Sequence, residues 1–476
     1  MVSSKKSKEI GLLNDNAENL IQNDKFGFDA YVDILEASIT ATESLPFTVG
    51  IFGEWGTGKT TLMKFLQQKF ESRGYKTIWL NPWKYDTRED IRKALITSIL
   101  LELKKIYKNN KSDLISVLLK DTAWIAAEKG ITYLTGGILL GLVDNARERI
   151  IEAKQKEMEF INQFEEKFKQ LINNLVGDDG RLILFIDDLD RCLPENTTVI
   201  LESLKLFLDE PHCIFILGMD RKIVEQAIKI RYKDITDFSG TDYLDKIIQL
   251  PFFIPPIQYE KLKVYLEEST KLVSDYDDNI WSLIDYGFAG NPRKVKRFVN
   301  CYYLLQKALD SRTILEQYSD KESVDEFNRY PKKDRLFFLA KILIIRMIYT
   351  EFYDYLVYNN QVLDHFEQAV IDGTEGILDK EIIISYPELE PYLKMRDLRK
   401  FFENTSCGTN VFPQTPPLSV IKYLLLLTGL VEGGKSTPAI KSEVTTTSGS
   451  PINISGLSNR DSYIPQSQPT DTYRKP

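Results

Sequence analysis

A short apolar run that leads directly into a glycine-rich loop constrains this chain more than any other feature. The run Phe47–Phe52 is rich in β-branched and aromatic residues and predicts a buried strand. The loop Gly53–Thr60 follows with the pattern Gly-x-x-x-x-Gly-Lys-Thr, and the residues from Thr61 to Leu66 have helical spacing. This order of strand, loop and helix favours a phosphate-binding loop over an ordinary glycine turn.

The chemistry of the loop predicts which residues hold a nucleotide. Glycines let the loop curl so that successive backbone N–H groups face phosphates, and the positive end of the next helix points at the same anion. We expect Lys59 to reach the β- and γ-phosphates and the Thr60 hydroxyl to ligate Mg²⁺. The predicted nucleotide-binding residues are Gly53, Glu54, Trp55, Gly56, Thr57, Gly58, Lys59, Thr60 and Thr61.

A second signal stands at the end of another apolar run. Leu182–Ile186 predicts a strand, and Asp187 and Asp188 follow it. We expect Asp187 to hold Mg²⁺, directly or through water, and Asp188 to orient or polarise the attacking water. Alone, this pattern also fits a helix N-cap. Beside bound phosphates, two carboxylates would repel the ligand without a metal, so the two motifs together imply Mg²⁺.

Two residues near these strands are further catalytic candidates. Arg191 either completes the site of a neighbouring subunit, where a cation stabilises charge at the γ-phosphate, or forms a surface ion pair with Asp190. Asp220 follows the predicted strand Cys213–Gly218, so its carboxylate is expected near the γ-phosphate. The alternative for Asp220 is a turn-forming role.

A basic helix supplies the last candidate. Pro292 is typical of the first position of a helix, and Arg293 and Arg297 share one face of it. One of them is expected to reach the nucleotide from a helical lid, and the alternative is a solvated basic helix. We favour the lid, because this helix follows the core in the order expected of such ATPases.

The predicted strands alternate with helical patterns, which indicates a parallel sheet with helices on both faces. The fold class is therefore α/β, with the three-layer core of a P-loop NTPase, a helical lid and a helical C-terminal domain. The tail is rich in Gly, Ser, Thr, Pro and Gln and is expected to be disordered. The predicted segments are a helical lead-in at 1–45, the core at 46–255 with a helical insertion at 105–178, the lid at 256–310, the C-terminal domain at 311–432 and the tail at 433–476.

Composition limits the partners and the cellular compartment that we expect for this chain. A net charge of −8 argues against general affinity for nucleic acid, although the basic cluster at 293–297 leaves phosphate contact open. The chain has no secretory signal and no paired cysteine pattern, so a reducing cytoplasmic setting is predicted. The apolar run Ile131–Val143 in the insertion is shorter than the about 20 residues that span a bilayer. An integral span is not predicted, and contact with the inner membrane face stays open.

These residues resemble the KAP family of P-loop ATPases, within the larger AAA+ and STAND group, over about residues 20 to 310. The resemblance implies Asp220 as a strand-end sensor, Arg293 as a sensor-like residue and ATP as the nucleotide. Family members often carry transmembrane helices between the two nucleotide motifs, and bacterial relatives are similar to phage-exclusion and defence proteins. The segments that carry the resemblance are 53–61, 81–85, 185–192, 218–221, 243–252 and 291–297.

Three functions remain open from the sequence. The first is an ATP-hydrolysing switch, with oligomerisation as one possible consequence of ATP binding and antiphage defence as its setting. The second is a nucleotide-gated module with little turnover, whose helical C-terminal part binds a partner protein or a phage component. The third is a DNA-linked motor. Asp188 is shorter than the Glu commonly found there, which leaves room for slow hydrolysis.

Overall fold

The computed structural model describes a subset of the chain, and several predictions lie outside it. The described residues are 12–15, 21–85, 91–106, 115–119, 166–177, 180–208, 212–236, 238–310, 321–371, 384–405 and 415–431. Most of the predicted insertion at 105–178, including the apolar run Ile131–Val143, lies outside them, and so does the predicted disordered tail at 433–476. Those predictions remain untested.

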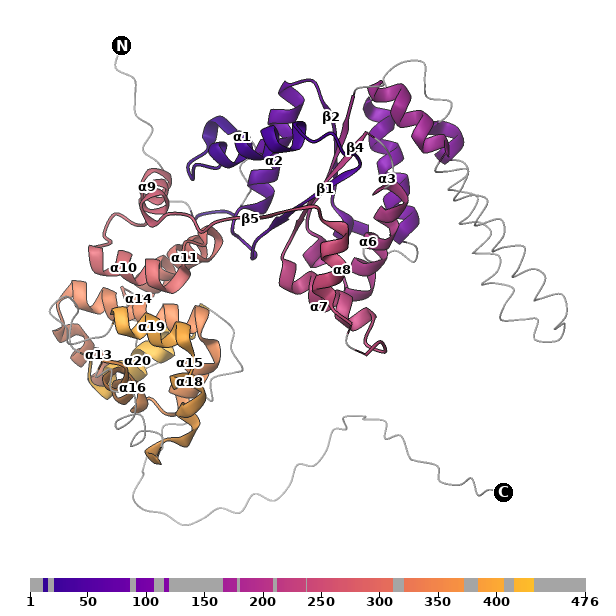
Figure 1. Ribbon diagram of the computed structural model, residues 1–476. Coiled ribbons are helices and arrows are strands. Elements are labelled where there is room, and N and C mark those ends of the chain that lie inside the picture. Colours follow the sequence, from indigo (N-terminus) through magenta and orange to yellow (C-terminus); the bar gives the residue numbers. More distant parts are fainter. Residues whose placement is uncertain are drawn as a thin grey trace, which may run out of the picture. The chain divides into compact units, whose positions relative to one another are not determined.

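A five-stranded parallel sheet forms the centre of the nucleotide-motif region, which confirms the predicted fold class (Figure 1). Its order is β2-β3-β4-β1-β5, and β5 adds an edge strand that the sequence did not single out. The strands are β1 (Phe47–Phe52), β2 (Lys76–Leu80), β3 (Leu182–Ile186), β4 (Cys213–Met219) and β5 (Leu250–Phe253).

Successive residues of the central strands enter two separate hydrophobic cores, one on each face of the sheet. Phe185 packs with one cluster and Ile186 with the other, as expected when side chains alternate along a strand. Helices α1 and α2 cover one face and α3, α6, α7 and α8 the other (Figure 1). These helices are α1 (Asp29–Thr40), α2 (Lys59–Ser72), α3 (Ile91–Ile106), α6 (Pro194–Leu208), α7 (Arg221–Arg231) and α8 (Gly240–Ile247).

Strand register determines where the predicted site residues emerge. Phe52 of β1 lies opposite Met219 of β4, and Ile186 of β3 lies opposite Leu217 of β4. All three strands run parallel, so their carboxyl ends reach one edge of the sheet together. The loop that begins at Gly53 and the pair that begins at Asp187 therefore leave the sheet side by side.

The secondary-structure elements after β5 are all helices in the part of the chain that the structure describes. Tyr302 of α11 donates its hydroxyl hydrogen to the Leu336 carbonyl of α14 at 2.9 Å, which joins the predicted lid to the C-terminal helices. No helix in the described ranges is long and apolar enough to cross a bilayer. The helices are α9 (Tyr259–Ser269), α10 (Asp278–Phe288), α11 (Pro292–Leu309), α13 (Lys321–Arg329), α14 (Lys332–Ile348), α15 (Thr350–Tyr358), α16 (Val362–Ile371), α18 (Glu390–Leu393), α19 (Arg396–Thr405) and α20 (Leu418–Thr428).

We predict that Arg181→Ala lowers the free energy of unfolding by about 1.5–3 kcal/mol, because a charged donor would be lost from three partly buried hydrogen bonds. The Arg181 guanidinium, just before β3, donates to the carbonyl oxygens of Ile39 and Thr40 at 3.1 Å and of Thr42 at 2.8 Å. Urea denaturation measures the loss. Arg231→Ala, at the exposed end of α7, is the control and should leave stability almost unchanged. Equal losses in both variants would contradict the assignment.

Candidate nucleotide-binding site

The glycine-rich loop adopts backbone angles that its glycines make possible. Gly56 has a φ of 88° and Gly58 a φ of 101°, both in the left-handed region. A Cβ atom on Gly58 would lie 2.7 Å from the Phe28 ring, and one on Gly56 would lie 2.4 Å from Arg293 Cβ. The loop is thus in close contact with the lead-in on one side and with α11 on the other.

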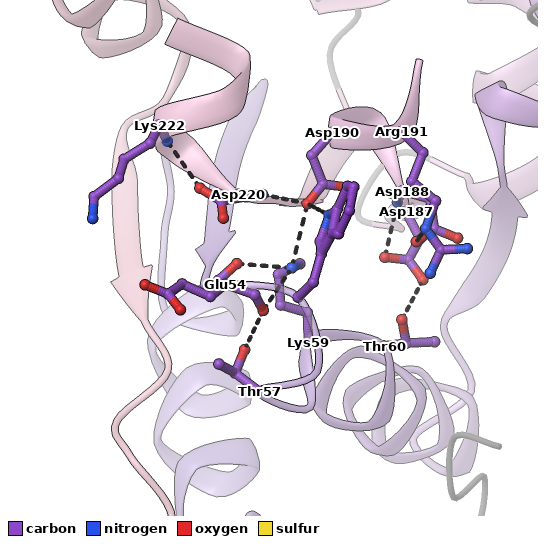
Figure 2. A network of polar contacts seen from close by, with 12 residues as sticks. Glu54, Thr57, Lys59, Thr60, Asp187, Asp188, Asp190, Arg191, Asp220 and Lys222 are labelled. Atoms are coloured by element: carbon purple, nitrogen blue, oxygen red, sulfur yellow. Dashed lines mark hydrogen bonds and ion pairs between the residues drawn. The ribbon is translucent and has the colours of Figure 1, made fainter. Parts of the chain in front are cut away.

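Lys59, the first residue of α2, turns its ammonium group back into the curl of the loop (Figure 2). Its Nζ donates to the carbonyl oxygens of Gly53 at 2.7 Å and Glu54 at 3.2 Å, and it lies 3.4 Å from Asp190 Oδ2. The side chain is only 8% exposed. A positive charge is therefore held beside the backbone amides that a phosphate would meet.

Thr60 and Asp187, the two predicted metal ligands, are in direct contact. Thr60 Oγ1 donates to Asp187 Oδ2 at 2.8 Å, although 127 positions separate them (Figure 2). Burial and the neighbouring Asp188 raise the pKa of Asp187 to about 6, against the lowering effect of the Thr60 hydrogen bond. The positive charge of Lys59 offsets the effect of burial only in part, and oxygen donors of this kind suit Mg²⁺.

Asp188 has both carboxylate oxygens engaged. Asn81, which directly follows β2, donates from Nδ2 to Asp188 Oδ2 at 2.8 Å, and Arg191 Nε lies 2.9 Å from Oδ1. The ion pair of Arg191 is therefore with Asp188, so the predicted alternative of a pair with Asp190 is wrong. The left-handed φ of Asp188, 63°, turns its carboxylate toward Arg191 and Asn81. The sequence did not predict a role for Asn81 in the site. Its position directly after β2 is the feature that could have indicated one.

Asp220 lies at the predicted strand end, but its carboxylate faces α7. It caps that helix by accepting from the Lys222 backbone N–H at 3.1 Å (Figure 2). Its own backbone N–H donates to Asp190 Oδ2 at 2.7 Å. This geometry is that of the turn-forming alternative, and the sensor role remains a prediction.

The start of α11 is tied to the loop. Asn291 caps α11 by accepting from the Lys294 backbone N–H at 3.2 Å, and its Nδ2 donates to the Trp55 carbonyl at 2.9 Å. Arg293 lines the pocket described below and forms an ion pair with Asp15 of the lead-in. Of the two arginines that share a helix face, Arg293 is the one on the pocket wall, whereas Arg297 is exposed and is not among the lining residues.

A pocket of about 510 Å³ opens beside the loop, a size typical of small-ligand sites. Its walls come from the loop, the lead-in and the lid region. Asp24 shapes the lead-in wall, because its carboxylate accepts from the backbone N–H groups of Phe26 at 3.0 Å and Gly27 at 3.1 Å. The Phe26 ring lies 5.1 Å from the Tyr265 ring. Asp24, Phe26 and Tyr265 were not predicted as site residues, because no motif marks them. Only the tertiary fold brings them to the loop.

The parallel sheet, the glycine-rich loop and the aspartate opposite it define a P-loop nucleoside triphosphatase. Residues 28–309 match the model of the KAP family P-loop domain, and the chain belongs to this family. The match covers the core and the predicted lid, and the C-terminal helices lie beyond it.

Comparison with curated proteins finds two relatives with limited coverage. The chain is 24% identical over 271 residues to the phage T7 exclusion protein of Escherichia coli strain K12, which covers 51% of this chain and 34% of that protein. It is 35% identical over 72 residues to an uncharacterised protein of Methanocaldococcus jannaschii, covering 15% of this chain and 37% of that one. The chain thus spans about a third of the length of each of these relatives.

The search of solved structures matches two proteins from Aeropyrum pernix, among others. The ORC2 protein, in ADPNP and ADP complexes, has a TM-score of 0.32 at 12% identity and covers 85% of this chain and 92% of its own. The ORC1 protein in complex with DNA has a TM-score of 0.33 at 13% identity and covers 81% of this chain and 83% of its own.

We predict that Gly58→Ala destabilises the protein by about 2–5 kcal/mol, because a left-handed backbone angle and an overpacked contact with Phe28 act together. Nucleotide affinity should fall at least about tenfold, since the loop would have to shift. Gly74→Ala is the matched control. It has a φ of 88° but nothing within 4 Å of a new Cβ, so it should cost only about 1–2 kcal/mol and leave nucleotide affinity unchanged. Urea denaturation and calorimetric titration with MgATP measure both effects, and equal losses would contradict the role of the Phe28 contact.

Proposed function

We propose that this chain binds ATP with Mg²⁺, hydrolyses it and works as a nucleotide-driven switch. The observation that carries the proposal is the 2.8 Å contact between Thr60 and Asp187 beside the Lys59 ammonium. A lysine and a hydroxyl at the start of α2, with a carboxylate at the end of β3, match the requirements of a metal-bound triphosphate. The pocket of about 510 Å³ provides the space for it.

Each group has a role in this proposal. Lys59 and the loop amides hold the phosphates, and Thr60 and Asp187 hold Mg²⁺, which when bound neutralises phosphate charge. Asp188 orients the attacking water. The aromatic wall of Phe26 and Tyr265 receives the base, since flat apolar side chains suit a purine ring. ATP is abundant in the cytoplasm, and the proposal includes a cytoplasmic setting.

The contacts of Asp188 favour slow turnover and so support a second candidate. Both of its oxygens already accept from a donor, one from Asn81 and the other from Arg191, and these contacts compete with an attacking water for the carboxylate. A nucleotide-gated interaction module with little turnover would keep Asp188 in this state. The two candidates share ATP binding and differ in phosphate release.

A continuous set of contacts connects the loop to the C-terminal helices. Asn291 at the start of α11 binds the Trp55 carbonyl at 2.9 Å, and Gly56 packs against Arg293. Tyr302, on the same helix, donates to the Leu336 carbonyl of α14 at 2.9 Å. A change in the loop on nucleotide binding would therefore move α11, and α11 would transmit the movement to the helices that we propose contact a partner protein, a phage component or a second copy of the chain.

We propose antiphage defence as the biological setting. The proposal is supported by the 24% identity to the phage T7 exclusion protein, which covers 51% of this chain. The aligned part is 34% of that protein, so its remaining portions have no counterpart in the alignment. The switch proposal does not depend on this setting.

We predict that Lys59→Ala weakens MgATP binding at least about tenfold and removes phosphate release, since the charge beside the phosphates is lost. Asp188→Ala should keep binding within about threefold and lose at least about 90% of phosphate release, because only the water-orienting group is removed. Calorimetric titration and a phosphate-release assay measure the two quantities.

Lys69→Ala is the control for lysine removal on α2. Its ammonium pairs with Asp33 at 2.8 Å, and Lys69 is not among the pocket-lining residues, so binding and release should both match the parent protein. Parent-level phosphate release in Lys59→Ala would contradict the proposed site. Nucleotide binding without phosphate release in the parent would favour the gated module over the hydrolase.

We predict that expression of the chain in a bacterial host lowers plaque formation by at least one phage of a panel that includes T7, and that Lys59→Ala restores it. The reason is that a nucleotide-driven switch cannot respond without its phosphate contact. Plaque counts at equal protein levels are the measurement, and Lys69→Ala should protect as the parent does. Equal counts for the parent and an empty vector across the panel would contradict the defence setting.

A further inference from the structure

Asp190, which carries no role in the proposed reaction, is contacted by donors from three parts of the site. It lies in the short 3-10 helix η3 (Leu189–Arg191), and its side chain is 1% exposed. Its Oδ2 accepts from Trp55 Nε1 at 3.0 Å and from the Asp220 backbone N–H at 2.7 Å, and it lies 3.4 Å from Lys59 Nζ (Figure 2). One oxygen atom thus joins the loop, the loop lysine and the end of β4.

The other carboxylate oxygen of Asp190, Oδ1, has a different environment from Oδ2. Oδ1 is buried and has no hydrogen-bond partner among the described residues. A buried carboxylate is costly unless it is paired, so the stabilisation of this charge rests on the donors to Oδ2. The only cation among these donors is Lys59, the residue that a bound triphosphate also requires.

We propose that Asp190 is a positioning residue that holds Lys59 and Trp55 in the nucleotide-free site and competes with the triphosphate for the Lys59 ammonium. The inference rests on the proposed binding of ATP at this loop. When nucleotide binds, Lys59 turns toward the phosphates, while Trp55 and the Asp220 amide remain bound to Oδ2. Asp190 therefore keeps the loop ordered and at the same time limits nucleotide affinity.

Asp190 acts in two ways, through its negative charge and as a hydrogen-bond acceptor. Two substitutions test these two effects separately. In Asp190→Asn the amide oxygen takes the place of Oδ2 and still accepts from Trp55 and Asp220. The amide nitrogen takes the place of Oδ1, where no hydrogen-bond partner lies among the described residues. The competing charge is gone, so MgATP should bind about threefold to tenfold more tightly.

Asp190→Ala should act in the opposite direction. It removes the acceptor for the Trp55 indole and for the Asp220 amide, so Trp55 of the loop is no longer joined to the end of β4, and this loss outweighs the removal of the competing charge. MgATP should bind about tenfold more weakly or worse. If Asp190 only supported the fold, Asp190→Asn and Asp190→Ala would both weaken MgATP binding. Opposite changes in affinity would therefore exclude a purely structural role.

A double-mutant cycle tests the contact with Trp55. Trp55→Phe removes the indole N–H and should be non-additive with Asp190→Ala, since both variants break the same hydrogen bond. Trp83 is the control, because it is similarly exposed, 42% against 50% for Trp55, but packs near Arg191. Trp83→Phe should be additive with Asp190→Ala.

The experiment is calorimetric titration of the full chain with MgATP, with urea denaturation of each variant alongside. Tighter binding by Asp190→Asn, weaker binding by Asp190→Ala and coupling confined to Trp55 would support the proposal. Binding by Asp190→Asn that equals or falls below the parent overturns it while leaving the proposed function intact. A parent protein that binds no MgATP overturns both. If Asp190→Ala does not fold, the Asn variant and Trp55→Phe still decide the outcome.

Discussion

The buried charge of Lys59 is the constraint on which the rest of this site depends. An ammonium group with 8% exposure needs acceptors on several sides, and the loop carbonyls and Asp190 provide them. Those acceptors lie in place only because Gly56 and Gly58 adopt left-handed angles and because β3 delivers η3 next to the loop. The phosphate site is therefore a local loop geometry completed by a distant strand.

The acidic residues after β3 have three different environments within four positions. Asp187 is buried against Thr60 and has a raised pKa, Asp188 is held by Asn81 and Arg191, and Asp190 faces Lys59 and Trp55. Equal side-chain chemistry thus serves metal binding, water orientation and loop positioning in our proposals. What separates them is the direction in which each carboxylate leaves the strand end, and the φ of 63° at Asp188 marks the change of direction.

Helix α11 links this chemistry to the remainder of the chain. Its first turn contacts the loop through Asn291 and Arg293, and its middle contacts α14 through Tyr302. The hydrophobic cluster on its side of the sheet continues from α1 and α2 into the C-terminal helices, so no separate core divides the two parts. This packing is the physical route that we propose for a nucleotide-dependent movement of the C-terminal helices.

The sequence by itself determined the strand–loop–helix motif and four of the five strands, and it indicated the candidate site residues, because strand periodicity and glycine spacing are local properties. Only the tertiary structure decided the partners of those residues. The pairing of Arg191 with Asp188, the capping role of Asp220, the place of Asn81 and the aromatic wall of Phe26 and Tyr265 all depend on contacts between distant segments. Such contacts follow from sheet register and helix packing, which a motif does not encode.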